Sequence, residues 1–68
     1  MELNQLKCFL EVARLEHITQ AADQLHITQP ALSKVIARLE DDLGAKLFDR
    51  EGKNIRLNEY GRVAQNYA

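Results

Sequence analysis

Residues 28–38 bring hydrogen-bonding and positively charged side chains together in a stretch that contains no acidic residue. Its polar and basic members are Thr28, Gln29, Ser33, Lys34 and Arg38. The amide of Gln29 is suited to form two hydrogen bonds with an adenine edge, and Lys34 is suited to guanine O6 and N7. Pro30 and Ala37 are small enough for close approach to a thymine methyl group. These residue types at this spacing favour contacts with the bases and phosphates of duplex DNA.

A helix that begins at Thr28 would display these side chains on one face. Thr28 suits the N-cap, where its hydroxyl accepts a free backbone N–H, and Pro30 is tolerated in the first turn. The same N-terminal N–H groups and the Thr28 hydroxyl are able to bind a phosphate. Ile27 and Leu32 have the spacing of a hydrophobic staple, and Gly44 is placed to end the helix. Apolar residues at helical spacing predict its buried stripe: Leu32, Val35, Ile36, Leu39 and Leu43.

Two helices are predicted ahead of this one. The first covers about residues 3–15, and its apolar stripe consists of Leu3, Leu6, Phe9, Leu10 and Ala13, flanked by Cys8 and Val12. Its opposite, polar face consists of Gln5, Lys7, Glu11 and Arg14. The second helix is short, begins near a cap at His17 or Thr19, and buries Ala21, Ala22 and Leu25. His26 stands at the turn position that often holds glycine, and histidine is among the residues that tolerate positive φ.

The hydrophobic period changes after Gly44. Residues 46–50 and 54–57 are extended in character, and the turn at 51–53 between them predicts a β-hairpin. Lys53 at its tip is expected to reach the DNA backbone or minor groove. For Arg50 and Arg56 the sequence allows two roles, a DNA contact or a position that faces solvent. Asn58 is the predicted N-cap of a last helix, in which Glu59 lies near the positive end and Gly61 permits close packing. One side of that helix carries Tyr60, Val63, Ala64 and Tyr67.

This order of elements predicts a mainly α fold, a winged helix-turn-helix with a three-helix core and a two-stranded β-wing at about 47–57. The apolar residues that the core requires are Ala21, Ala22, Leu25, Ile27, Leu32 and Val35. Small Ala22 would let the third helix cross the second steeply, which directs the start of the third helix outward. An α-helix fits the B-DNA major groove, which is about 12 Å wide.

Length and composition limit the other classes of function. The chain has 68 residues and a net charge of −1, which fits one small domain and not a generally basic coat protein. Its one cysteine, Cys8, forms no internal disulfide and suits a reducing, cytoplasmic setting. Residues 1–4 do not begin a signal peptide, and no apolar run approaches the ~18 residues of a membrane span.

The arrangement of these motifs resembles one family in particular. Residues 21–34 are similar to the signature of the LysR family of bacterial transcription regulators, as are residues 39–44 followed by 47–50. Residues 57–61 resemble the family's entry into its linker helix. The resemblance follows essentially the whole chain in order and without a gap, so it is more specific than one short motif.

The resemblance implies properties that the periodicity alone does not give. Residues 1–58 would form the DNA-binding domain, and residues 59–68 would begin a linker helix that pairs subunits into dimers or tetramers on promoter DNA. By positional match, the family's base and phosphate contacts fall on Gln29, Pro30, Ser33, Lys34 and Lys53. At the positions of Lys34 and Lys53 the family often has arginine. Lysine keeps the positive charge but lacks the planar guanidinium group that can form two parallel hydrogen bonds. A small inducer would bind a further domain, so we expect no cofactor on this chain.

Two other classes of function stay open. A winged helix that binds only protein would keep the core, but it would need an exposed apolar patch in place of a polar third helix. A small enzyme would need a convergent set of acid, base or nucleophile, which the sequence does not supply; we therefore expect no enzyme. Lys34 and Arg38 taken alone are typical of a solvated helix face. His17 and His26 lack the cysteine partners of a zinc site, and the acids at 40–42 are interpreted as an exposed helix end.

Overall fold

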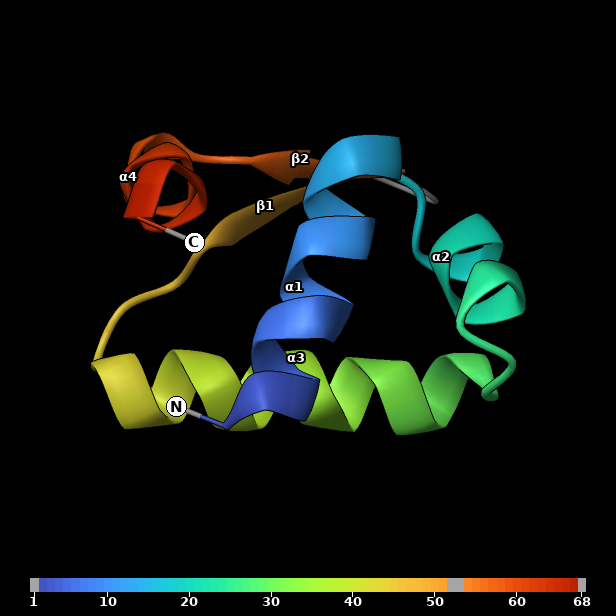
Figure 1. The fold of residues 1–68 in the computed structure, drawn as a ribbon. Helices are drawn as coiled ribbons and strands as arrows, with labels where there is room; N and C mark the ends of the chain where they lie inside the picture. Colours follow the sequence, from blue (N-terminus) through green and yellow to red (C-terminus); the bar gives the residue numbers. More distant parts are fainter. Residues whose placement is uncertain (1, 52–53, 68) are drawn as a thin grey trace.

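The computed structural model describes residues 2–51 and 54–67, which form four helices and a two-stranded antiparallel sheet (Figure 1). The elements in chain order are α1 (Leu3–Leu15), α2 (Ile18–Gln24), α3 (Gln29–Leu43), β1 (Phe48–Glu51), β2 (Asn54–Leu57) and α4 (Glu59–Tyr67). In Figure 1, α1 crosses α3, α2 lies near the start of α3, and α4 lies on the other side of the molecule. The predicted mainly α fold with a two-stranded wing is confirmed, and the strands lie within the predicted 47–57 segment.

One apolar core joins the helices to the hairpin. Its members, all buried, are Cys8, Phe9, Val12, Ala13, Ile18, Ala21, Ala22, Leu32, Ile36, Leu39, Leu47, Phe48, Ile55 and Leu57. The rings of Phe9 in α1 and Phe48 in β1 have centroids 5.6 Å apart at a tilt of 55°. Tilted aromatic pairs of this kind stabilise packing beyond the area they bury. The wing is therefore attached to the same core that holds the three helices together.

The ends of the helices follow the capping residues in the sequence. His17 is the N-cap of α2, where its Nδ1 accepts a hydrogen bond from the Gln20 N–H at 3.2 Å. Asn58 caps α4, since its Oδ1 accepts from the Gly61 N–H at 2.8 Å. Gly44 ends α3 at φ 70°, in the left-handed region that glycine adopts without strain. Of the two predicted N-cap candidates for α2, His17 and Thr19, the structure shows His17 as the N-cap.

Gly61 is required by a close approach between α4 and the residues around the hairpin. A Cβ atom added there would lie 2.3 Å from the Leu47 carbonyl oxygen and 2.5 Å from the Leu57 Cδ1. The interpretation of Gly61 as a close-packing residue is confirmed. Because α4 touches the core mainly through Gly61 and half-buried Ala64, the larger Tyr60 and Val63 stay exposed.

Side chains from three segments fix the base of the hairpin. The Glu16 carboxylate accepts a hydrogen bond from the Leu57 N–H, and the Glu40 carboxylate accepts one from the Leu47 N–H at 2.7 Å. The Asn58 side-chain amide donates to the Lys46 carbonyl at 2.9 Å. These bonds tie the segment just before β1 and the last residue of β2 to residues of α1's C-cap, α3 and α4's N-cap, so the wing has a defined position relative to the helices.

The structure corrects the predicted burial of four residues. Gln5, which the sequence places on the polar face of α1, is only 4% exposed, and its burial is tolerated because its Oε1 accepts a hydrogen bond from the Glu2 N–H. The sequence predicts that Leu3 and Leu43 are buried, but they are 81% and 44% exposed, since each is a terminal residue of its helix. It also predicts that Ile27 is in the core, whereas this residue is 37% exposed because it lies in the turn between α2 and α3.

Candidate nucleic-acid interface

The first turns of α3 present one polar face away from the core. Thr28 is the N-cap, and its Oγ1 accepts a hydrogen bond from the Ala31 N–H at 3.3 Å. The side chains on the outer face are exposed, apart from half-buried Ser33; they are Gln29, Pro30, Ser33, Lys34, Ala37 and Arg38. The opposite face carries Leu32, Ile36 and Leu39, which are buried. One helix therefore supplies both a core stripe and an accessible row of donors and cations.

The turn before α3 sets the direction in which that row points. His26 has φ 59°, so the predicted positive φ at this site is confirmed. The Ile27 N–H donates to the Ala22 carbonyl at 3.0 Å, and the His26 N–H donates to the Asp23 carbonyl at 3.1 Å. Ala21 and Ala22 are buried beneath the turn, where their small size allows α2 and α3 to approach closely. The start of α3 is therefore held at a fixed angle to α2.

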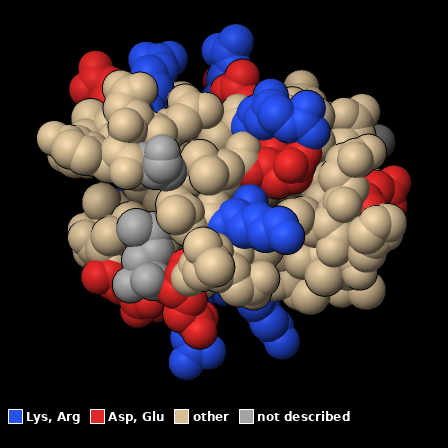
Figure 2. Space-filling model, in the orientation of Figure 1, with Lys and Arg blue, Asp and Glu red and all other residues tan. Residues whose placement is uncertain are grey.

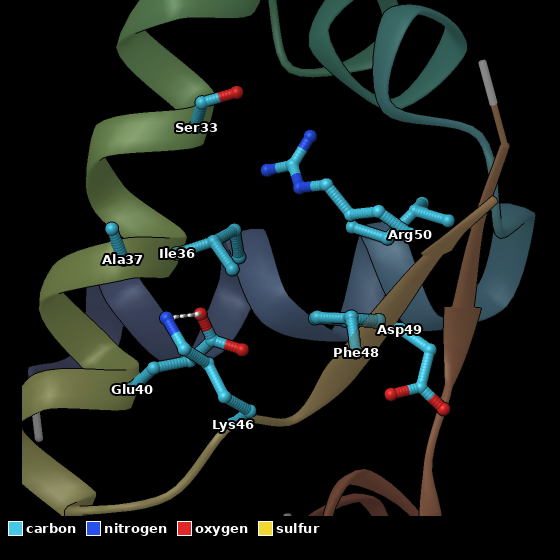
Figure 3. A pocket seen from close by; sticks show the side chains of 9 residues that line it. Ser33, Ile36, Ala37, Glu40, Lys46, Phe48, Asp49 and Arg50 are labelled. Atoms are coloured by element: carbon cyan, nitrogen blue, oxygen red, sulfur yellow. Dashed lines mark ion pairs between the residues drawn. The ribbon is translucent and has the colours of Figure 1, made fainter. Parts of the chain in front are cut away.

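A groove runs between α3 and β1, beside the outer face of α3 (Figure 3). We call it the helix–wing groove; it measures about 460 Å³, and the residues that define it are Ser33, Ile36, Ala37, Phe48, Arg50 and Ile55. Glu40, Lys46 and Asp49 also border it. Figure 3 shows Arg50 extending from the strand towards α3. The groove is therefore continuous with the helix face through Ser33 and Ala37.

Basic and acidic side chains lie close together on the surface of the described residues. On the face shown in Figure 2, basic and acidic side chains are interspersed with wide uncharged areas. Arg14 and Glu11 form an ion pair within α1, and the Lys46 Nζ lies 4.0 Å from a Glu40 carboxylate oxygen. With a net charge of −1, affinity for a polyanion would have to come from cations at the contact surface itself.

The structure brings six of the seven sequence-predicted site residues together on α3 and its cap: Thr28, Gln29, Pro30, Ser33, Lys34 and Arg38. The seventh, Lys53, lies outside the described residues. Arg50 borders the groove although the sequence left its position open. The signal that could have placed it is its two-residue spacing from Phe48, because alternate residues of a strand share a face.

The remaining chemically reactive groups do not form a second site in the described part of the chain. Cys8 is buried, and its burial raises the pKa of the thiol while nearby Lys7 lowers it by a smaller amount. Among residues 2–51 and 54–67, no three His, Cys, Asp or Glu side chains are grouped to hold a metal ion. No helix in those residues is both long enough and apolar enough to cross a membrane.

Comparison with known proteins places this arrangement in a family. Residues 3–62 match the family described as bacterial regulatory helix-turn-helix protein, lysR family. The chain is 57% identical over 63 residues to the uncharacterized HTH-type transcriptional regulator YybE of Bacillus subtilis (strain 168), a match that covers 93% of this chain and 22% of that protein. It is 44% identical over 68 residues to the HTH-type transcriptional regulator PcaQ of Agrobacterium fabrum (strain C58), covering 100% of this chain and 22% of that protein. The chain therefore spans about a fifth of the length of these relatives.

Solved structures show the same fold. The crystal structure of the CbnR DBD–DNA complex matches with a TM-score of 0.94 and 36% identity, over 98% of this chain and 77% of that one. A LysR-family transcriptional regulator from Eggerthella lenta matches with a TM-score of 0.91 and 39% identity, over 98% and 96% of the two chains. The winged helix-turn-helix fold and the near-complete match over residues 3–62 agree, and the chain belongs to the LysR family of bacterial regulatory helix-turn-helix proteins.

Proposed function

We propose that this chain is the sequence-specific DNA-binding domain of a LysR-type bacterial transcription regulator, and that α3 enters the major groove of promoter DNA. The observation that carries the proposal is the two-sided α3: Leu32, Ile36 and Leu39 anchor it in the core while its first turns stand exposed. An anchored helix with exposed donors can read base edges without reorganising first. The CbnR DNA-binding domain, which has the same fold, was crystallised in complex with DNA, and this supports DNA as the proposed partner.

Each residue of the outer face has a role in the proposal. Gln29 and Lys34 read adenine and guanine edges, and Pro30 contacts a thymine methyl group. Ser33 bonds to a base or a phosphate, while Thr28 and the N–H groups of the first turn hold a phosphate. Arg38 adds a cation further along α3. Lys53, outside the described residues, is proposed to reach the backbone or the minor groove.

The proposal extends to the assembly and the setting of the protein. Residues 1–58 act as the DNA-binding domain, and residues 59–68 begin a linker helix that pairs subunits. Tyr60, Val63 and Tyr67 are exposed and have the spacing of one side of α4, which supports a pairing role, because a group of apolar side chains on a surface marks an interaction site. The regulator works in the cytoplasm as a dimer or tetramer on double-stranded DNA. The proposed contacts require no cofactor and no catalytic group, and the related proteins are named as transcription regulators.

Selection of bound sites from random duplex DNA tests this function directly. We expect enrichment of a defined sequence, and an inverted repeat in that sequence if the protein binds as a dimer. Binding to the enriched duplex should weaken as salt rises, because phosphate contacts release counterions. A Gln29→Ala variant should lose the preference at one position, whereas Gln65→Ala, exposed on α4, should keep it.

The same titration separates DNA binding from the rival function of a protein-interaction winged helix. That rival predicts no enriched sequence, and binding that is absent or insensitive to salt at two concentrations. Either result would contradict the proposal.

A further inference from the structure

Glu40 lies in the second half of α3, on the side that borders the helix–wing groove. It follows Ser33 and Ala37 at helical spacing and, like them, lines the groove. Its side chain is only 11% exposed. A carboxylate withdrawn from water in this way costs free energy unless its oxygens are hydrogen-bonded, so the partners of Glu40 explain its position.

The carboxylate of Glu40 bonds to the segment that leads into the wing. One oxygen accepts a hydrogen bond from the Leu47 N–H at 2.7 Å, and the other lies 4.0 Å from the Lys46 Nζ. Figure 3 shows the carboxylate beside Lys46, between α3 and the start of β1. Leu47 is 2% exposed, and its carbonyl oxygen accepts a hydrogen bond from the Asn58 N–H at 3.0 Å. Both backbone polar groups of Leu47 are therefore engaged, which fixes the point where the wing begins.

This hydrogen bond spans a place where the two DNA-facing elements are otherwise apart. The helix–wing groove, of about 460 Å³, lies between α3 and β1, and the Cα atoms of α3 rarely come within 8 Å of those of either strand. Among the hydrogen bonds of residues 2–51 and 54–67, only the one from Leu47 to Glu40 joins a side chain of α3 to the hairpin region. The contacts of the hairpin with Phe9 and Glu16 lead to α1 instead.

We propose that Glu40 is a positioning residue for DNA binding, because its hydrogen bond to Leu47 holds the wing at the separation from α3 at which both elements reach one duplex. The inference rests on the proposed function, in which α3 reads the major groove and Lys53, outside the described residues, reaches the backbone or the minor groove. When a hairpin pivots at its base, its far end is displaced more than the base. The buried stripe of α3 anchors the helix itself, so base reading does not depend on Glu40.

Two substitutions of Glu40 separate the hydrogen bond from the charge. Glu40→Gln keeps the length of the side chain and an oxygen that accepts the Leu47 N–H, but it loses the charge. Glu40→Asp keeps the charge but is one methylene shorter, so its carboxylate falls short of that N–H. Each variant would be titrated with the duplex recovered by selection, between about 50 and about 200 mM salt. The temperature is one at which circular dichroism shows the protein to be folded.

The salt dependence of binding should follow the hydrogen bond and not the charge. Glu40→Asp should lower the log–log salt slope by about 0.9 for each phosphate contact that the wing loses, and it should weaken binding to all sequences alike. The preference at the base pair read by Gln29 should be retained. Glu40→Gln should keep the slope, and so should the control Asp42→Asn, an exposed position on the same helix. A merely structural role would lower the thermal midpoint of Glu40→Asp without changing the slope of the folded protein.

A double-mutant cycle with Lys53→Ala connects the effect to the wing. Lys53→Ala should reduce the salt slope of the unsubstituted protein. In the Glu40→Asp background the same substitution should have a much smaller effect, because a displaced wing has already lost the contact. Non-additivity of this kind distinguishes positioning of the wing from a contribution that Glu40 makes elsewhere.

The outcomes distinguish this inference from the proposed function. The positioning role is overturned, while DNA binding itself stands, by equal slopes for the Asp and Gln variants of Glu40 or by a Lys53→Ala effect of the same size in both backgrounds. A Glu40→Asp variant that does not fold while Glu40→Gln does would also overturn it, since the bond would then be needed for the fold as a whole. Absence of salt-dependent DNA binding by the unsubstituted protein would overturn the proposed function, and the positioning role with it.

Discussion

The carboxylate of Glu16 accepts a hydrogen bond of 2.9 Å from the backbone N–H of Leu57, a residue 41 positions further along the chain. Glu16 ends α1 in the left-handed region at φ 49°, which is unusual for a residue other than glycine. The conformation directs its side chain to the end of β2. Together with the packing of Phe9 against Phe48, this hydrogen bond joins the first helix to the wing.

Glu16→Ala should lower the free energy of unfolding by about 1–3 kcal/mol, because the partly buried Leu57 N–H loses its acceptor. Glu16→Gln should lose less, since its amide oxygen is still able to accept the bond. Both substitutions keep a side chain at positive φ, so their difference isolates the hydrogen bond. Urea unfolding followed by circular dichroism measures it, and equal losses would show that the bond does not contribute.

Gly61→Ala and Gly44→Ala should destabilise the protein for different reasons. At Gly61 the new methyl group would meet the Leu47 carbonyl oxygen at 2.3 Å, and overpacking of this kind costs about 1–3 kcal/mol. That cost should exceed the ~1 kcal/mol gained from the better helix propensity of alanine. At Gly44 nothing lies within 4 Å, so the cost of about 1–2 kcal/mol comes from φ 70° alone.

A set of further substitutions tells the two glycines apart. Asn has a lower cost than alanine in the left-handed region, so Gly44→Asn should recover part of the loss in thermal unfolding. Gly61→Asn should be at least as damaging as Gly61→Ala, because its side chain is larger. Recovery at Gly61 would contradict the close contact with Leu47 and Leu57.

Gln29→Ala and Lys34→Ala should relax the DNA sequence preference at two different base pairs. If Gln29 reads an adenine, its loss should cost about 1–3 kcal/mol at that base pair and relax the preference there. If Lys34 reads a guanine, its loss should likewise cost about 1–3 kcal/mol at that base pair and relax the preference there. Lys7→Ala, an exposed lysine on α1, is the matched control and should leave both preferences unchanged. Binding isotherms on the selected duplex and its single-base variants measure these effects.

The buried thiol of Cys8 should make stability fall at alkaline pH. Burial raises the pKa of Cys8, so the unfolded chain releases this proton before the folded chain does. The contribution of Cys8 is therefore complete below the ordinary thiol pKa of about 8.5, and it is lost as the pH rises through the raised pKa of the folded state. Urea unfolding from about pH 7 upwards should show a steeper decline for the unsubstituted protein than for Cys8→Ala. Parallel curves would contradict the prediction.

The sequence predicted the elements of this fold well where local chemistry decides the structure. Thr28 before Pro30 marks the start of α3, and Gly44 marks its end, because caps and positive φ are set by single residues. In the same way, Asn58 and His17 mark the starts of α4 and α2 as their N-cap residues. These features depend on a few neighbouring residues, so they can be read without knowledge of the rest of the chain.

Burial at the edges of the core was harder to predict. Leu43 continues the helical period of α3 and yet is exposed, because periodicity does not say where the neighbouring element stops. Gln5 is polar and yet buried, which is tolerated because its amide oxygen accepts a hydrogen bond from the Glu2 N–H. The contact from Glu16 to Leu57 joins residues too distant for any local pattern to reveal.

One part of the candidate site could be predicted from local sequence and the other part could not. The exposed row on α3 follows from helical spacing, and six of its predicted residues do lie together. The groove beside Arg50 depends on how the hairpin is placed against α3, and the sequence does not specify that packing.

Because α3 is buried on one side and exposed on the other, neither side can shift independently. A volume change at Leu32 or Ile36 would tilt the helix and displace Gln29 and Lys34 with it. Altered operator preference could therefore evolve through interior substitutions that never touch a base, and closely similar outer faces need not imply identical targets.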